Sequence, residues 1–299
     1  MNPVALLRAL RPEQWSKNVF VLAPLVFAMG DQRLAERPGG EQVWRTALAF
    51  AAFCLMASTI YLVNDAHDVE SDRQHPRKKN RPIASGAVSI PLALGTAVAC
   101  ALGSLALGVA ASGGGWQIPG TLLAYLVLNL AYSYQLKRVV LLDAFCIAAG
   151  FLMRVAVGGA AAGAPISQWL FLCTLFLSLF LALNKRRAEL VLLGEEGAAH
   201  RASLQHYTIG FVDQMVSVLA ACTVVCYTMY TVGDDTVAKF GDNRLMWTVP
   251  FVVFGIGRYM VLVQSGGGGN PTRVLLGGDV WFLVNSLGWA ATVAWALFL

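Results

Sequence analysis

Charged residues are scarce in this sequence. Only 13% of the 299 residues are Asp, Glu, Lys or Arg, whereas 57% are hydrophobic and the mean hydropathy is +0.60. Soluble domains carry about 25% charged residues, so the lipid bilayer is the expected solvent for most of the chain. The net charge of +5 does not indicate a nucleic-acid partner, because the cations lie in short segments between apolar runs, where they set topology and bind anionic headgroups.

A pattern of soft metal ligands is also missing. The six cysteines all fall inside apolar runs, none forms a C-x-x-C pair, and none lies near a histidine. They are typical of small buried side chains, and a zinc site is not expected. No cleavable signal peptide is indicated either, because the apolar run after Lys17 has no small-residue cleavage site close behind it. The first apolar run is therefore expected to stay as a span.

About nine apolar runs are long enough to cross roughly 30 Å of hydrocarbon. The first run is short and the fifth contains Arg154. Together they predict an all-α membrane protein with about nine transmembrane helices and a single polytopic domain over residues 1–299. The runs are residues 18–30, 43–63, 91–111, 118–135, 139–160, 168–184, 211–232, 245–264 and 279–298.

The segments between these runs alternate in positive charge. This bias predicts a multi-pass protein of the cell membrane, with the N-terminus and the basic loops in the cytoplasm. The predicted outside segments hold few cations, namely Arg33, Arg37, Arg45, Lys239 and Arg244. The predicted inside segments hold Arg8, Arg11, Lys17, Arg73, Arg77, Lys78, Lys79, Arg81, Lys137, Arg138, Lys185, Arg186, Arg187, Arg201 and Arg273.

The acidic cluster after the second run carries the clearest chemistry. If the helix continues, Asp65, Asp68 and Asp72 fall at i, i+3 and i+7, with Asn64 close to the same face. Like charges on one face repel unless a cation offsets them, and carboxylate oxygens suit Mg²⁺ that is also held by substrate phosphates. A solvated loop is the alternative. The cluster begins at the end of a span, where uncompensated acid is costly, which favours catalytic metal ligands at Asp65, Asp68 and Asp72 and a substrate contact at Asn64.

A basic segment, residues 73–86, follows immediately. We expect Lys78 and Arg81 to contact a diphosphate, whereas for Arg77 and Lys79 a role as topology signals is as good an explanation.

The pattern N-D-x-x-D-x-x-x-D over Asn64–Asp72, followed by R-P-I-A-S-G at residues 81–86, resembles the signature of the UbiA-type membrane prenyltransferase superfamily. The resemblance implies nine transmembrane helices around a central cavity, open to the cytoplasm and laterally to lipid. It also implies that aspartate-rich loops hold a diphosphate through Mg²⁺.

Two further segments, R-P-E-Q-W-S-K-N at 11–18 and N-K-R-R-A-E-L at 184–190, resemble the decaprenyl-phosphate phosphoribosyltransferase branch of that superfamily. This resemblance implies transfer of 5-phosphoribose from phosphoribosyl diphosphate to a polyprenyl phosphate, with release of diphosphate. Such a reaction belongs to a lipid-linked pentose pathway for cell-envelope glycan synthesis. An anionic acceptor needs no strong general base, and His67 points away from its neighbouring aspartates on a helix, so a catalytic histidine is not expected.

Prenyl-diphosphate users of the superfamily generally carry a second aspartate-rich motif after the sixth span, where this sequence has Lys185, Arg186 and Glu189. Lysine and arginine suit a phosphate that carries no metal, so the reversal favours two separate phosphate-bearing substrates. Positive-inside residues at a helix end are the alternative explanation.

Four more residues are assigned to the substrates. Arg154 is costly inside a span and therefore a functional candidate, although it could instead pair with Asp143 or a backbone carbonyl. Tyr134 and Lys137 end the fourth run and could reach the sugar or its 5-phosphate, and Lys17 could contact the lipid phosphate.

Two functions are alternatives to phosphoribosyl transfer: a prenyltransferase with a small aromatic acceptor, and a polyprenyl-phosphate transporter. The sequence leaves the oligomeric state open.

Overall fold

The computed structural model describes residues 3–33, 38–76, 78–193, 206–265 and 279–298, and helices are the only regular secondary structure in these ranges. Four cations of the topology argument lie outside the described residues: Arg37, Arg77, Arg201 and Arg273.

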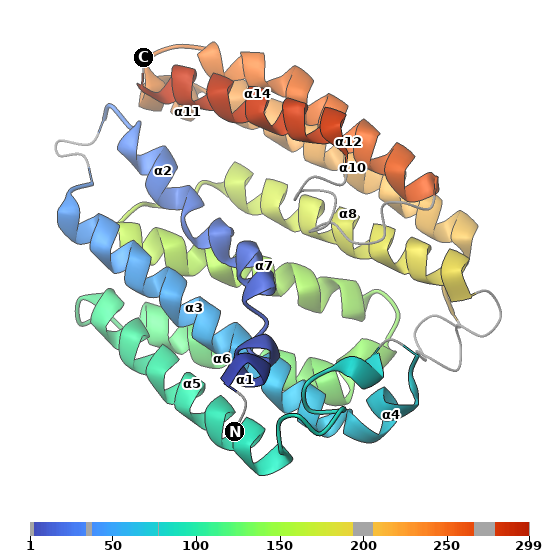
Figure 1. Ribbon diagram of the computed structural model, residues 1–299. Helices are drawn as coiled ribbons and strands as arrows, with labels where there is room; N and C mark the ends of the chain where they lie inside the picture. Colours follow the sequence, from blue (N-terminus) through green and yellow to red (C-terminus); the bar gives the residue numbers. More distant parts are fainter. Residues whose placement is uncertain (1–2, 34–37, 77, 194–205, 266–278, 299) are drawn as a thin grey trace. The chain divides into compact units, whose positions relative to one another are not determined.

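Eight longer helices make up most of the described chain (Figure 1). They are α3 (Gly40–His67), α5 (Ile90–Ser112), α6 (Gln117–Tyr134), α7 (Leu142–Ala162), α8 (Gln168–Leu193), α10 (Ile209–Val232), α12 (Val249–Gln264) and α14 (Val280–Phe298). Shorter helices and 3₁₀ turns join them: α1 (Pro3–Ala9), η1 (Pro12–Val21), α2 (Ala23–Met29), α4 (Val69–Gln74), η2 (Lys78–Asn80), η3 (Leu136–Arg138), α11 (Asp234–Phe240) and η6 (Arg244–Thr248).

Seven helical segments in the described ranges are long and apolar enough to cross a membrane: α3, α5, α7, α8, α10, η6 with α12, and α14. The predicted all-α, multi-pass membrane fold is thereby confirmed, whereas the count of nine spans is not. The predicted run 118–135 forms α6, which is only 18 residues long and includes a glutamine, an asparagine and three tyrosines, so it is not among the segments long and apolar enough to cross a membrane. The predicted first run, residues 18–30, is divided between η1 and α2 and does not form one helix.

The break in the first run follows from Pro24 within it and from Pro12 shortly before it. Arg11 adopts a left-handed conformation (φ 54°) before Pro12 opens the 3₁₀ helix η1. The chain then leaves η1 at Leu22 and begins α2, with Pro24 in its first turn. A proline has no N–H and is tolerated in the first turn of a helix but not in its interior. A continuous helix over 18–30 is therefore replaced by two short elements.

The chain divides into two compact units, and a single domain over 1–299 stays a prediction. The first unit comprises Met1–Leu25, Pro38–Tyr134 and Met153–Pro165. Within it α3 packs along α5, and α6 contacts both helices. At Gly108 a methyl group would lie 2.5 Å from Cδ1 of Leu122, so glycine permits the close approach of α5 and α6. The core between these helices contains Val21, Ala49, Phe53, Met56, Ala111, Ile118 and Leu122.

The second unit comprises Val26–Arg37, Gln135–Leu152 and Ile166–Leu299. Here α8 packs along α10, and α12 contacts α8, α10 and α14. Its main core contains Ala144, Ala148, Leu179, Phe180, Leu183, Val212, Val216 and Tyr259.

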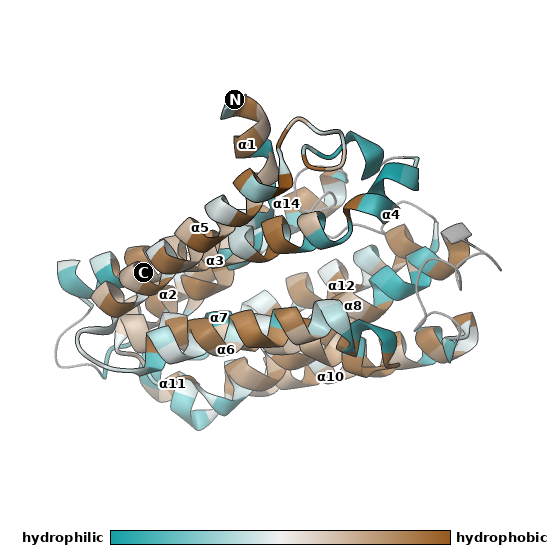
Figure 2. Ribbon diagram, turned by 90° about the horizontal axis from the view of Figure 1, so that it is seen from below, coloured by the Kyte–Doolittle hydropathy of each residue, from teal (hydrophilic) through white to brown (hydrophobic). Residues whose placement is uncertain are grey.

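Figure 2 shows apolar residues along the long helices and hydrophilic residues gathered over α4. Large apolar side chains are exposed along the helices, for example Leu102, Val127 and Val284. Apolar surface of this extent suits contact with lipid. The polar segment after α3 is therefore a candidate for contact with water-soluble substrates.

Candidate functional site

The predicted continuation of α3 through the acidic cluster holds with one interruption. Asp68 (φ −90°, ψ 9°) separates α3 from α4, but its N–H still donates to the Asn64 carbonyl at 2.9 Å, and the Asp72 N–H donates to the Asp68 carbonyl at 2.8 Å. The backbone therefore nearly keeps its helical path, which leaves Asp65 and Asp72 on the same side.

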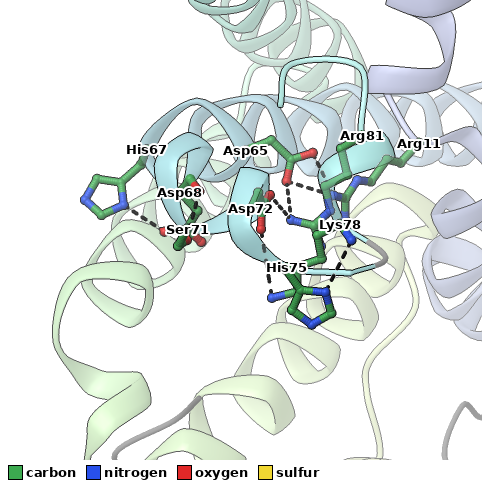
Figure 3. Close-up of polar contacts among 9 residues, drawn as sticks. All are labelled: Arg11, Asp65, His67, Asp68, Ser71, Asp72, His75, Lys78 and Arg81. Atoms are coloured by element: carbon green, nitrogen blue, oxygen red, sulfur yellow. Dashed lines mark hydrogen bonds and ion pairs between the residues drawn. The ribbon is translucent and has the colours of Figure 1, made fainter. Parts of the chain in front are cut away.

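Asp65 and Asp72 are buried and share one arginine. Only 4% of Asp65 and 1% of Asp72 is exposed. Nη1 of Arg81 donates to Oδ1 of Asp65 at 3.1 Å and to Oδ2 of Asp72 at 2.5 Å, as Figure 3 shows. Nζ of Lys78 lies 4.0 Å from Oδ1 of Asp72. Two carboxylates and two cations of the predicted site are thus brought together.

The R-P-I-A-S-G segment places Arg81. Ile83 and Val88 are each 2% exposed and pack in a small apolar cluster. Gly86 (φ 81°) turns the chain with its N–H bonded to the Ile83 carbonyl, and the Val88 N–H donates to the Pro82 carbonyl at 2.9 Å. A left-handed φ favours glycine. The motif is therefore a turn anchored by an apolar residue, and it holds Arg81 over the acids.

Arg11 is a site residue that the sequence reasoning missed. Its Nη2 lies 2.7 Å and 2.6 Å from the two carboxylate oxygens of Asp65, and its guanidinium lies over the ring of Tyr61, 5.0 Å from the centroid. Holding a non-glycine residue at φ 54° costs about 1–3 kcal/mol. In the sequence Arg11 was assigned only to the cytoplasmic cations and to the 11–18 resemblance, and neither of these predicted a contact with Asp65.

Asp68 does not join the other two acids. Its side chain is 37% exposed, and its Oδ1 lies 2.9 Å from Nδ1 of His67. The prediction that His67 points away from its neighbouring aspartates is therefore wrong for Asp68, because the helix is interrupted at that residue. The His67 ring stands edge-on to Tyr134, with 5.0 Å between centroids. Figure 3 shows Asp68 beside His67, apart from the arginines. The structure thus gathers Asp68, His67 and Tyr134 into a second group. Asn64, directly before Asp65 in sequence, is half-buried.

The donor set fits Mg²⁺ if the substrate completes it. Within the described ranges no three acid, histidine or cysteine side chains are gathered closely enough to hold a metal by themselves. Mg²⁺ is usually bound by one or two carboxylates together with substrate phosphates and water. Asp65 and Asp72 offer hard oxygen ligands of that kind, now compensated by Arg11 and Arg81.

Arg154 is buried within the first unit, and its contacts hold it in one orientation. Nε donates to Oδ1 of Asn18 at 2.8 Å, and Nη2 donates to the Tyr125 hydroxyl at 2.8 Å. The guanidinium also lies over the rings of Phe53 and Tyr125, at 5.3 Å and 4.9 Å. Lys17 lies on η1, one residue before Asn18, and is partly buried. Asp143, which the sequence offered as an alternative partner for Arg154, bonds Arg186 and Tyr207.

The second cluster, in the second unit, is built around a buried ion pair. Arg186 and Asp143 are each 0% exposed, and Nε of Arg186 donates to Oδ2 of Asp143 at 2.8 Å. Nη1 of Arg186 also donates to Oε2 of Glu189. The side chain of Lys185 is 52% exposed, with Nζ 4.0 Å from Oε1 of Glu189. Lys185 therefore faces solvent, whereas Arg186 lies in the interior.

Tyr207 extends this network to the chain before α7. Its hydroxyl donates to Oδ1 of Asp143 at 2.8 Å and accepts the Leu141 N–H at 2.7 Å. Burial raises the pKa of the Tyr207 hydroxyl above its ordinary value, so the group stays protonated as a donor. Leu141 adopts φ 64°, a strained conformation for leucine. Lys137, on η3 just before this segment, is partly buried.

Long apolar helices, with buried, ion-paired carboxylates in the last turn of α3 and on α4, define an all-helical, multi-pass membrane protein with a polar site at the end of α3. The chain belongs to the UbiA prenyltransferase family, which it matches over residues 21–283.

Relatives of known name resemble the chain over almost its whole length. A decaprenyl-phosphate phosphoribosyltransferase of Corynebacterium glutamicum is 37% identical over 98% of this chain and 87% of its own length. A protein of the same name from Mycolicibacterium smegmatis is 36% identical over 98% of this chain and 92% of its own. The fold is similar to that of a UbiA homolog from Archaeoglobus fulgidus bound to GPP and Mg²⁺, with a TM-score of 0.70, 16% identity, and coverage of 99% of this chain and 100% of the homolog.

Proposed function

We propose that this protein transfers 5-phosphoribose from phosphoribosyl diphosphate to a polyprenyl phosphate of the decaprenyl type. An oxygen of the lipid phosphate forms a bond to the anomeric carbon of the ribose, and the bond from that carbon to the diphosphate breaks. Diphosphate leaves, and the product is a lipid-linked phosphoribose for cell-envelope glycan synthesis.

One observation carries the proposal. Two decaprenyl-phosphate phosphoribosyltransferases are 36–37% identical to this chain, and each alignment covers 98% of it. Each alignment covers almost the whole chain, so the similarity supports a shared reaction as well as a shared fold.

The acidic cluster is assigned to the diphosphate. Asp65, Asp68 and Asp72 would hold Mg²⁺ together with diphosphate oxygens, and the bound ion supplies positive charge that stabilises the leaving group. Arg81 contacts both buried acids in this structure. A guanidinium binds carboxylate and phosphate oxygens in the same bidentate manner, so Arg81 can pass from the acids to the diphosphate, with Lys78 beside it.

The remaining residues position the sugar and the lipid phosphate. Arg154 presents a buried guanidinium whose direction is fixed by Asn18 and Tyr125. Lys17, Asn64, Tyr134 and Lys137 keep their assignments as substrate contacts.

The second cluster supports the phosphoribosyl reaction over prenyl transfer. A prenyl-diphosphate site of this superfamily would be expected to hold metal on a second pair of acids. Here Asp143 and Glu189 are the acids, and both are bonded to Arg186. Lys185 remains the exposed cation of this segment and is the residue we assign to a phosphate that carries no metal.

The location follows from the charge bias. We place the polar segments after α3 and after α8 on the cytoplasmic side of the cell membrane, where phosphoribosyl diphosphate, a soluble metabolite, would reach them. A cavity that opens to the cytoplasm and to lipid is part of the same proposal.

A donor competition tests the reaction. Purified protein in lipid is incubated with Mg²⁺, polyprenyl phosphate, phosphoribosyl diphosphate and a prenyl diphosphate with 4-hydroxybenzoate, and the lipids are analysed by mass spectrometry. We expect a polyprenyl phosphate heavier by one phosphoribosyl group. A prenylated aromatic product without the phosphoribosyl lipid would refute the proposal in favour of a prenyltransferase.

A further inference from the structure

We propose that Arg186, Asp143 and Tyr207 form a positioning clamp, which fixes the segment that carries Lys137 relative to the helix that carries Lys185. The two lysines are thereby aligned for a phosphate monoester of one of the two substrates. The inference rests on the proposed function for its substrates, but the clamp itself is read from contacts within the second unit.

The first step is that the Arg186 side chain is buried and bonded to two carboxylates, so we assign it to positioning and not to substrate contact. Its side chain is 1% exposed, and its guanidinium donates to Asp143 and Glu189. A buried ion pair gains little stability over apolar residues of the same volume, because both charges lose their hydration. What such a pair adds is direction, since each donor is aimed at one acceptor.

The second step is that both carboxylate oxygens of Asp143 are committed to different segments. Oδ2 accepts from Arg186 on α8, and Oδ1 accepts from Tyr207, just before α10. Asp143 lies in the first turn of α7. One carboxylate therefore ties together three segments that are distant in sequence.

The third step leads to Lys137. The Tyr207 hydroxyl accepts the N–H of Leu141, whose φ of 64° requires support from its surroundings. The turn that holds Lys137 ends two residues before Leu141, with the Val139 N–H bonded to the Leu136 carbonyl at 3.1 Å. The hydroxyl of Tyr207 thus restrains the short segment that follows the Lys137 turn.

The fourth step leads to Lys185. Glu189 accepts from Arg186 and also lies 4.0 Å from Nζ of Lys185. Through Glu189 the buried arginine restrains the exposed lysine that precedes it. The clamp therefore restrains the segment next to Lys137 on one side and Lys185 on the other. Its contacts include no aspartate of the acidic cluster.

The variant Tyr207→Phe removes both hydrogen bonds of the hydroxyl, the one to Asp143 and the one from Leu141, and keeps the aromatic ring. We expect the Michaelis constant for one phosphorylated substrate to rise about tenfold, as for the loss of one hydrogen bond, with kcat within about threefold. A rise for phosphoribosyl diphosphate identifies the sugar 5-phosphate as the ligand, and a rise for polyprenyl phosphate identifies the lipid phosphate. In a Lys137→Ala background the same change should add less than about threefold, because residues that act through one another are not additive.

Tyr227→Phe is the matched control. Its hydroxyl also lies in a polar network of the second unit, with Thr248 at 2.7 Å and Trp289 at 3.0 Å. We expect both Michaelis constants to stay within about twofold, since this network touches neither lysine. Equal effects of the two variants, or effects of Tyr207→Phe and Lys137→Ala that multiply, would overturn the clamp.

Hydrogen exchange tests the clamp without any turnover. The peptide spanning residues 135–141 should exchange at least about tenfold faster in Tyr207→Phe, because the Leu141 N–H loses its acceptor, and should not change in Tyr227→Phe. Unchanged exchange refutes the clamp even if phosphoribosyl transfer is found. Faster exchange in a protein that makes no phosphoribosyl lipid refutes the proposed function and leaves the clamp standing.

Discussion

At the residue scale, the two buried acids of the cluster differ from the exposed one. Asp65 and Asp72 face the same guanidinium, whereas Asp68 faces His67. We expect Asp65→Asn and Asp72→Asn each to lower turnover by at least about 10²-fold, since each loses a charge assigned to Mg²⁺ and the leaving group. Asp68→Asn should lower it less if the metal rests mainly on the buried pair. Initial rates of phosphoribosyl transfer measure all three.

Glu70→Gln is the matched control for these variants. Glu70 lies on α4 between Asp68 and Asp72. Its side chain is 79% exposed, and its Oε1 accepts from Nη1 of Arg73, three residues further along the helix, at 3.0 Å. Its loss should leave turnover within about threefold, as an exposed i, i+3 pair contributes well under 1 kcal/mol. Wild-type rates in both Asp65→Asn and Asp72→Asn would show that the metal site has been assigned to the wrong residues.

Arg154 provides a second test at this scale. Arg154→Met keeps much of the volume and removes the charge, so the protein should stay folded while activity falls. The loss of a charge-assisted bond to phosphate corresponds to about 1.5–3 kcal/mol, or roughly 10- to 150-fold in rate at low substrate.

Arg45→Met is the control for that change. Arg45 donates to the carbonyls of Ala111 and Ser112 at the end of α5, so its loss should lower the thermal midpoint without changing turnover per folded molecule. If Arg154→Met behaves in the same way, Arg154 is a structural residue.

The sequence located part of this site and missed part of it for physical reasons. The spacing of Asp65 and Asp72 predicted their common face because both lie on nearly continuous helix. Arg11 is 54 residues from its partner Asp65, and local periodicity carries no information about such a contact. Likewise, a cation that marks topology and one that is buried in an ion pair look the same in sequence, so the interior position of Arg186 was not predicted.

At the element scale, the small residues of α7 mark a close approach. A methyl group at Gly158 would lie 2.1 Å from the Val21 carbonyl oxygen and 2.9 Å from its carbon. Alanine normally favours a helix by about 1 kcal/mol over glycine, but here backbone atoms would have to move. We expect Gly158→Ala to lower the thermal midpoint measurably, by several degrees.

Gly95→Ala serves as the comparison. Gly95 lies on α5 in the same unit, and nothing is within 4 Å of a methyl group there. That substitution should leave the midpoint unchanged or raise it. A Gly158→Ala protein as stable as Gly95→Ala would show that η1 and α7 are not in the contact described.

Helix positions were predictable where apolar runs were long and uninterrupted. Residues 43–63 were predicted and α3 extends further at both ends, because the polar residues Glu41 and Asp65 are accommodated in its end turns. Pro24 in the first run breaks the helix locally, which an average over hydropathy does not register, whereas the polar residues of α6 lower its mean hydropathy below that of a spanning helix. These two elements are therefore where the predicted and observed spans differ.

At the scale of the whole molecule, the charge bias predicts which side each segment faces. Single cysteines introduced at Gln74 and Asn243, both exposed, in a variant without the six native cysteines report this directly. An impermeant maleimide applied to intact cells should label Asn243→Cys, and should label Gln74→Cys only after the membrane is opened. Labelling of Gln74→Cys in intact cells would reverse the topology.

The fold of the whole chain was predictable because a low charge content and long apolar runs leave few alternatives to a helical membrane bundle. The reaction was not predictable from these features, since every member of a helical membrane family needs them. It depends on a few polar side chains, and on the similarity of the complete chain to phosphoribosyltransferases.

The most direct measurement follows two labels in one donor. Phosphoribosyl diphosphate carrying ¹⁴C in the ribose and ³²P in the β-phosphate is incubated with the protein, polyprenyl phosphate and Mg²⁺. We expect ¹⁴C to enter the lipid extract and ³²P to be released into the water phase as diphosphate. EDTA should prevent both the transfer of ¹⁴C and the release of diphosphate. Lipid that contains neither label, or that contains ³²P, would contradict phosphoribosyl transfer.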